Sequence, residues 1–150
     1  MLNKTQQLPF HQSTIVSTHP LEYIFTDVWQ SPILSPQNYR YYLVLVDHFT
    51  RYTWLFPLTK KSDVKTIFET FKPIAETKFK HKISTLYSDN GGEFLSLRPF
   101  LAQHGISHLT TPPHTPQHNG LSERKHRHIV ETGLSLLSAA KMPLTYWPFA

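Results

Sequence analysis

Three consecutive segments rich in aromatic and β-branched residues constrain the fold of this chain more than any other feature. They cover residues 21–29, 39–47 and 51–58. This composition is typical of β-strands. A link of only a few residues separates the second segment from the third, which predicts a hairpin. Three strands in succession predict an antiparallel meander.

Beyond the meander, helical and strand patterns alternate. The expected elements are, in order, a helix over residues 61–80, a strand over 83–87, a short helix over 93–103, a strand over 106–109, a proline-rich loop, and a last helix from about 119 to about 141. Ser62 is the expected N-cap of the first helix, and Pro73 is expected to kink or shorten it. Gly105 is expected to end the short helix. The pattern therefore predicts an α/β fold of the α+β type, with helices flanking a mixed sheet.

Composition narrows the functional classes. The 150 residues carry 15 Lys and Arg against 10 Asp and Glu, so the net charge is +5. This moderate positive charge favours a polyanionic partner, nucleic acid first. Cysteine is absent, which excludes disulfides, a cysteine nucleophile and thiolate zinc sites. No apolar run reaches the ~20 residues of a membrane span and no secretory signal is evident, so we expect a soluble intracellular domain without membrane contact.

The chain is long enough for one domain with a single core. Residues 1–20 lack periodicity and end in Pro20, so we expect an extended lead-in followed by the domain over residues 21–150. The chain ends just after an apolar cluster of Tyr146, Trp147 and Phe149. This ending predicts a C-terminal truncation within a larger protein.

Three carboxylates occupy positions suited to chemistry. Asp27 lies within the first expected strand, Asp89 just after the fourth, and Glu123 in the first turns of the last helix. If the first and fourth strands are neighbours, the two aspartates meet near the sheet and the helix supplies the glutamate. Carboxylates gathered in this way need neutralising charge, which hard divalent cations supply. Each residue alone also fits a structural role, as a strand-end, turn or helix-start acid, but together they favour a site for two metal ions.

Basic residues directly follow the third carboxylate. On a helical wheel Glu123 falls at the edge of the apolar face, and Arg124, Lys125 and Arg127 follow it. The cluster is either a solvated helix face or a set of phosphate contacts, and its place beside the expected metal site favours contact with DNA.

Six histidines crowd the same part of the chain. They are His104, His108, His114, His118, His126 and His128. A zinc site would need three or four of them to converge, but the intervening glycine and prolines give poor ligand spacing. We therefore expect loop histidines and histidines that face nucleic acid, with His126 packed on the apolar face of the last helix.

Four segments together resemble the integrase catalytic core of copia-type LTR retrotransposons, within the retroviral integrase superfamily. They are FTDVW, YYLVLVDHFTRYTWLFPL, LYSDNGGEF and TPQHNGLSERKHRHIVE. The resemblance covers nearly the whole chain, and SDNGGEF followed by TPQHNG-x-x-ERK is its most specific part. The spacing from Asp89 to Glu123 is slightly shorter than in the superfamily, a difference that a loop can absorb.

The resemblance implies an RNase H-like fold in which Asp27, Asp89 and Glu123 hold two Mg²⁺ or Mn²⁺ ions. It implies DNA integration: metal-dependent 3′-end processing of element DNA and strand transfer into target DNA, by a homo-oligomer of the full-length protein. Gln117 and Asn119 would then join the basic cluster as DNA contacts. Asp47 would have a structural role, pairing with Arg51.

The resemblance also implies context outside the catalytic core. Residues 1–20 would be the linker from a missing upstream zinc module. The full-length protein would act in the nucleus after a cytoplasmic particle stage. Two alternatives stay open: a non-catalytic nucleic-acid-binding remnant of a degenerate retrotransposon, and an RNase H-type hydrolase of RNA–DNA hybrids.

Overall fold

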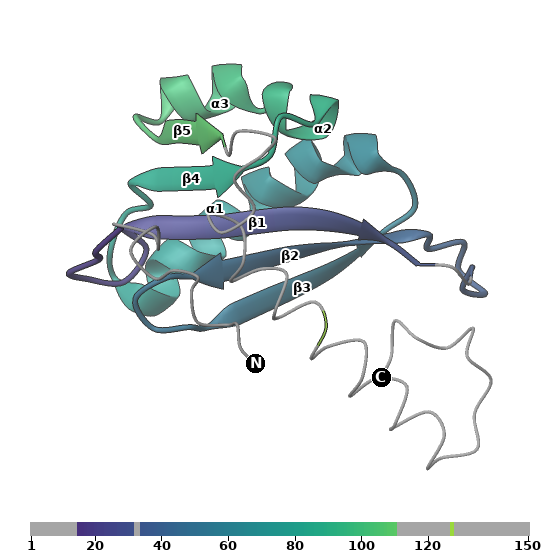
Figure 1. The fold of residues 1–150 in the computed structure, drawn as a ribbon, viewed down its shortest axis with the longest axis horizontal. Coiled ribbons are helices and arrows are strands. Elements are labelled where there is room, and N and C mark those ends of the chain that lie inside the picture. The colour runs from purple at the N-terminus through teal and green to yellow at the C-terminus, as the bar shows by residue number, and fades with distance from the viewer. Residues whose placement is uncertain (1–14, 32–33, 111–126, 128–150) are drawn as a thin grey trace, which may run out of the picture.

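A computed structural model describes residues 15–31, 34–110 and 127, and shows a five-stranded mixed sheet with helices packed against it (Figure 1). In chain order the elements are β1 (Tyr23–Gln30), β2 (Tyr41–Asp47), β3 (Thr53–Leu58), a 3₁₀ turn (Lys61–Asp63), α1 (Val64–Phe79), β4 (Thr85–Ser88), α2 (Gly92–Leu95), α3 (Arg98–Gln103) and β5 (Ser107–Thr110). All five expected strands are present in the described part of the chain, and they follow in the expected order.

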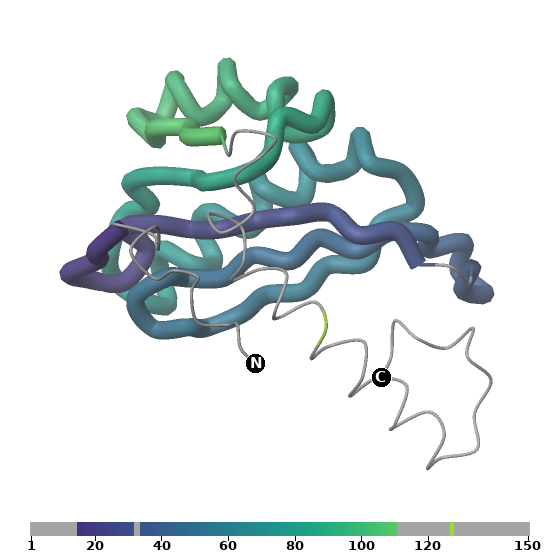
Figure 2. Tube along the Cα trace, viewed as in Figure 1, coloured from purple at the N-terminus to yellow at the C-terminus, as the bar shows by residue number. Residues whose placement is uncertain are grey.

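The strands lie in the order β3-β2-β1-β4-β5. The first three form the expected antiparallel meander, and β4 and β5 add to it in parallel with β1. The trace in Figure 2 shows the chain leaving β3, crossing through α1 and returning to the other side of β1. Because β1 and β4 are parallel neighbours, their carboxyl ends meet at the same edge of the sheet.

Most of the core lies between the sheet and its three helices. Alternate residues of β1 and β2, such as Ile24 and Leu43, belong to one buried cluster with Phe68 and Phe71 of α1 and Leu101 of α3. The opposite face of the sheet carries a second cluster of Tyr42, Val44 and Val46, against which Trp29 packs. The period-two alternation of strands therefore separates two faces, and the helices of the described residues cover the first.

The first helix begins and continues differently from the expectation. Ser62 is not an N-cap, because it lies inside the 3₁₀ turn. The carboxylate of Asp63 instead accepts hydrogen bonds from Thr59 Oγ1 and the Lys60 amide. Pro73 does not shorten α1, which runs 16 residues through it. Packing of the buried side chains on either side of Pro73 offsets the backbone hydrogen bond that proline cannot donate.

The expected helix over residues 93–103 is two helices, α2 and α3. Pro99 lies in the first turn of α3, where its missing N–H is tolerated, and it could not continue a helix from α2 without a clash. Gly105 follows α3 with a φ of 71°, a left-handed conformation that glycine adopts without strain. The expected helix end is therefore confirmed and the expected continuity is wrong.

Within the described part of the chain, no helix has the length and apolar character that crossing a bilayer requires.

Candidate metal centre

Strand pairing brings Asp27 of β1 near the carboxyl end of β4, which Asp89 directly follows. The last pair in the parallel register of β1 and β4 is Phe25 with Tyr87, and each aspartate comes two residues later. The rings of Phe25 and Tyr87 stack with their centroids 5.0 Å apart. Since side chains alternate along a strand, the Asp27 carboxylate lies on the face that carries this stacked pair, and Asp89 directly follows the end of the neighbouring strand. The first and fourth strands are neighbours, which is the condition under which the two aspartates come near each other.

Asp27 lies in the middle of the sheet. Its residue is 8% exposed, and it is paired with Val44 of β2. The Asp27 Oδ1 atom accepts a hydrogen bond from the Val28 amide at 2.9 Å. A carboxylate held this deep in the fold needs charge or donors brought to it, because burial without them costs several kcal/mol.

Asp89 is half-buried and directly follows β4, whose burial alternates along the strand. Its Oδ1 atom accepts a hydrogen bond from the Gly91 amide at 2.8 Å. This contact is an Asx-type turn, in which the side chain closes a loop with the backbone two residues later. The turn ends the strand and sets the direction of the carboxylate at the edge of the sheet.

The other predicted site residues lie mostly outside the described part of the chain. These are Glu123, Gln117, Asn119, Arg124 and Lys125. Arg127 is described, and it is helical and exposed, as the expected last helix requires. Among the described residues no three His, Asp or Glu side chains group closely enough to hold a metal ion. The described part of the site therefore consists of two of the three expected carboxylates.

The predicted partner of Asp47 is wrong. Asp47 is fully buried, and its carboxylate accepts hydrogen bonds from the Leu21 amide at 2.8 Å and from the amide and hydroxyl of Thr50 at 3.0 and 2.6 Å. No ion pair joins it to Arg51 within residues 34–110. Arg51 has a φ of 66° and contributes its backbone amide to the Asp47 carbonyl. A tight turn that brings Thr50 back onto Asp47 leaves the guanidinium exposed.

We expect the Asp47→Ala change to lower the free energy of unfolding by about 2 kcal/mol, because it removes the acceptor for a buried amide and for Thr50. Arg51→Gln is the matched control and should change the free energy by less than about 0.5 kcal/mol. Urea denaturation measures both. A larger loss for Arg51→Gln than for Asp47→Ala would contradict the hydrogen bonds seen here.

Two histidines near the sheet are held in environments that favour the neutral ring. Burial lowers the pKa of His48, and Arg51 lowers it further against the opposing effects of Asp47 and Glu22. Burial and then Arg98 lower the pKa of His108. His108 lies in β5, within the expected strand over residues 106–109, and both of its ring nitrogens have protein partners. Its contact with nucleic acid stays a prediction.

These lowered histidine pKa values make stability depend on pH. The unfolded chain takes up protons as the pH falls below the ordinary value of 6.5, while the folded chain resists protonation of His48 and His108. The stabilisation that comes from keeping these two rings neutral is therefore fully present above pH 6.5, and it is lost as the pH falls below that value. We expect the urea midpoint to drop between about pH 7.5 and about pH 5.5. The double variant His48→Gln/His108→Gln should show a shallower drop, and an equally steep one would contradict the assignment.

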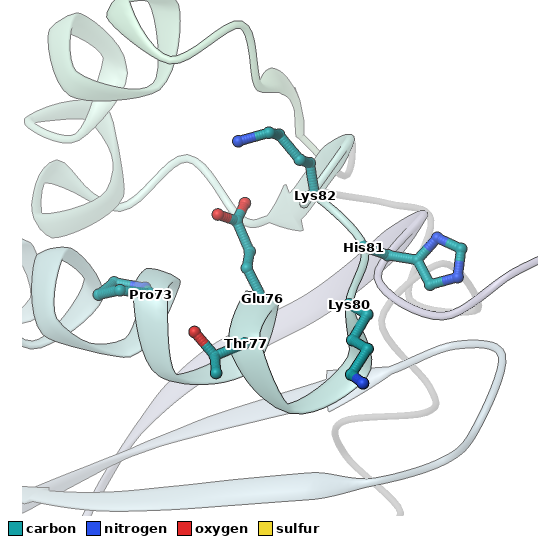
Figure 3. Close-up of a pocket in the computed structure, with 6 residues that line it drawn as sticks. All are labelled: Pro73, Glu76, Thr77, Lys80, His81 and Lys82. Atoms are coloured by element: carbon teal, nitrogen blue, oxygen red, sulfur yellow. The ribbon is translucent and has the colours of Figure 1, made fainter.

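A separate pocket of about 610 Å³ lies beside the end of α1 (Figure 3). Its lining residues are Pro73, Glu76, Thr77, Lys80, His81 and Lys82. Glu76 accepts hydrogen bonds from Lys72 Nζ and the Ile83 amide. The residues that follow α1 here lead into the amino end of β4, whereas Asp89 follows its carboxyl end. The pocket is therefore distinct from the pair of aspartates.

Sequence reasoning missed the groups that hold Asp89 in place. The hydroxyl of Ser88 donates to the Asp89 carbonyl at 2.8 Å and also contacts His108 Nε2 at 2.7 Å. The signal available in the sequence was a small hydroxyl residue directly before the candidate ligand. Its partner His108 lies 20 residues later, and only the parallel pairing of β4 with β5 brings the two together.

The chain is similar to curated proteins of plant transposons. It is 67% identical over its full length to the retrovirus-related Pol polyprotein from transposon RE1 of Arabidopsis thaliana. It is 66% identical over 99% of its length to the corresponding polyprotein from transposon RE2 of the same plant. A polyprotein from transposon TNT 1-94 of Nicotiana tabacum is 34% identical over 98% of the chain. The chain spans only 10–11% of the length of these relatives.

A solved structure shares the fold. It is the cryo-electron microscopy structure of the simian T-cell lymphotropic virus intasome in complex with the PP2A regulatory subunit B56 gamma. The TM-score is 0.71 at 19% identity, and the match covers 97% of this chain and 51% of the other. The mixed sheet thus has the architecture of a retroviral integrase, in agreement with the expected RNase H-like fold. Residues 17–116 match the family described as the integrase core domain. This protein therefore belongs to the integrase core domain family.

Proposed function

We propose that this chain is the catalytic core of a copia-type retrotransposon integrase, a polynucleotidyl transferase. It would process the 3′ ends of element DNA and transfer them into target DNA with the help of divalent metal ions. The observation that carries the proposal is the position of Asp27 and Asp89, each two residues beyond the last pair of the neighbouring parallel strands β1 and β4. The match to the integrase core domain supports the same reaction class.

The two aspartates fit hard divalent cations by their chemistry. Carboxylate oxygens are the ligands that Mg²⁺ and Mn²⁺ prefer, and both aspartates offer such oxygens. The Val28 and Gly91 amides each hold one carboxylate oxygen, which orients the groups before any ion binds. We propose Glu123 as the third ligand. When bound, a pair of such ions polarises the attacking oxygen and the phosphate of a phosphodiester.

DNA contact is proposed for the helix that follows the carboxylates. Arg127 is exposed, and a helix through it would present Arg124 one turn away; Lys125 is the third proposed basic contact of this helix. Such residues neutralise phosphates, so binding should weaken as salt concentration rises. Gln117 and Asn119 are the proposed contacts in the preceding loop. In the full-length protein we propose a homo-oligomer on DNA, by analogy with the intasome that shares this fold, acting in the nucleus after a cytoplasmic particle stage.

Calorimetric titration with Mn²⁺ tests the metal site directly. The 150-residue chain should bind the ion, and the Asp89→Asn and Glu123→Gln variants should each lose binding. Glu69→Gln serves as the matched control, because Glu69 is an exposed helical carboxylate that pairs with Lys65. Absence of Mn²⁺ binding by the unmodified chain would overturn the proposal. Salt-dependent DNA binding with neither metal binding nor strand cleavage would instead support the non-catalytic nucleic-acid-binding remnant.

A further inference from the structure

A chain of hydrogen bonds runs from the helical face of the sheet to the backbone of Asp89. Arg98 Nε lies 3.4 Å from His108 Nδ1, and His108 Nε2 lies 2.7 Å from Ser88 Oγ. Ser88 Oγ then donates to the Asp89 carbonyl oxygen at 2.8 Å. The chain connects three elements, since Arg98 begins α3, His108 lies in β5 and Ser88 ends β4.

Each hydrogen bond in this series has one donor and one acceptor, and the assignments are consistent from Arg98 to Asp89. The Arg98 side chain only donates, so His108 Nδ1 is the acceptor and the neutral ring carries its proton on Nε2. The Nε2 proton therefore points at Ser88 Oγ, and the single hydroxyl proton of Ser88 is directed to the Asp89 carbonyl. The Nε2-protonated tautomer of His108 therefore satisfies every hydrogen bond from Arg98 to the Asp89 carbonyl.

The position of the Asp89 carbonyl also decides where its carboxylate points. The bond from the Gly91 amide to Asp89 Oδ1 closes only when the backbone between the two residues is suitably turned. The Ser88 hydroxyl holds the carbonyl in that same stretch of backbone. Ser88 is fully buried, so no competing water reaches it from bulk solvent. The two hydrogen bonds therefore act on one torsion of the backbone and support each other.

We propose that His108, acting through Ser88, is a positioning residue that sets the orientation of the Asp89 carboxylate for metal binding. The inference rests on the proposed function, because it assigns Asp89 as a metal ligand. His108 itself does not touch the metal or the DNA in this proposal. Its role is to keep the Ser88 hydroxyl turned toward the Asp89 carbonyl.

The affinity for Mn²⁺, measured by calorimetry, tests the role of His108. We expect His108→Ala to weaken binding about 10- to 100-fold, the usual effect of removing a group that supports a ligand. His108→Gln should restore most of the affinity, because its amide can still donate to Ser88. His104→Ala is the control, since His104 is exposed and its ring contacts only the Phe100 carbonyl and ring among the described residues.

A double-mutant cycle separates positioning from general destabilisation. Ser88→Ala should weaken Mn²⁺ binding as His108→Ala does. The two changes together should lower the Mn²⁺ affinity little more than either alone, because both break the same series of hydrogen bonds. Additive losses would overturn the proposal. Equal affinity of His108→Ala and the unmodified chain would also overturn it while leaving the proposed function intact.

The tautomer of His108 provides a readout that needs no metal. The ¹⁵N chemical shifts of the ring distinguish a proton on Nε2 from one on Nδ1. We expect the Nε2-protonated form in the unmodified chain. A proton on Nδ1 would overturn the inference, whatever the metal affinity. Failure of the unmodified chain to bind Mn²⁺, with the Nε2 form present, would remove the proposed function and with it the metal role inferred for His108.

Discussion

The Asp89→Asn variant is expected to lose at least about 1,000-fold of metal-dependent DNA strand cleavage. Loss of one carboxylate ligand removes several kcal/mol of metal-assisted stabilisation of the transition state, and each 1.36 kcal/mol is a tenfold change in rate. The asparagine side chain keeps an oxygen that can accept from the Gly91 amide, so the turn after β4 survives and only the charge is lost. Nicking of labelled element-end DNA in the presence of Mn²⁺ measures the effect.

Controls for this prediction separate chemistry from folding. Glu69→Gln should keep cleavage unchanged, because Glu69 lies on the exposed side of α1. The circular dichroism spectrum and urea midpoint of Asp89→Asn should stay close to those of the unmodified chain. Cleavage by Asp89→Asn within about tenfold of the unmodified chain would show that Asp89 is no metal ligand.

The Phe71→Ala change should lower the free energy of unfolding by about 4 kcal/mol, the usual cost of deleting a buried phenyl ring. Phe71 is fully buried, and its ring contacts Trp54 of β3 edge to face with centroids 4.9 Å apart. It also packs against Phe68 on the same helix. Removal leaves a cavity between α1 and the sheet that neighbouring aromatic rings cannot fill. Urea denaturation followed by tryptophan fluorescence measures the loss.

Ile74→Ala is the matched control for this core substitution. Ile74 lies on the same helix but is 53% exposed, so its truncation should cost less than about 1 kcal/mol. Similar losses for the two variants would mean that α1 does not pack on the sheet through Phe71. The pair thus tests the helix-on-sheet packing that positions the whole meander.

Particular residues show which parts of the fold the sequence predicted and which it did not. The aromatic and β-branched residues in 21–29 predicted a strand that carries Asp27, and the structure places that strand at the centre of the sheet. The recurrence of Phe68 and Phe71 at helical spacing predicted α1 and its buried face. Pro99 was not recognised as a helix restart, because its effect depends on whether the preceding residues continue the helix. The assignment of Asp27, Asp89 and Glu123 as metal ligands stays a prediction.

The sequence by itself determined the order of strands and helices and the residue types available for chemistry. These follow from periodicity and side-chain propensity, which act between residues close together in the chain. Only the tertiary structure decided that β4 lies beside β1, that the Leu21 amide reaches Asp47, and that His108 reaches Ser88. Those contacts join residues far apart in sequence, and they form only when burial of the sheet face selects one register among many.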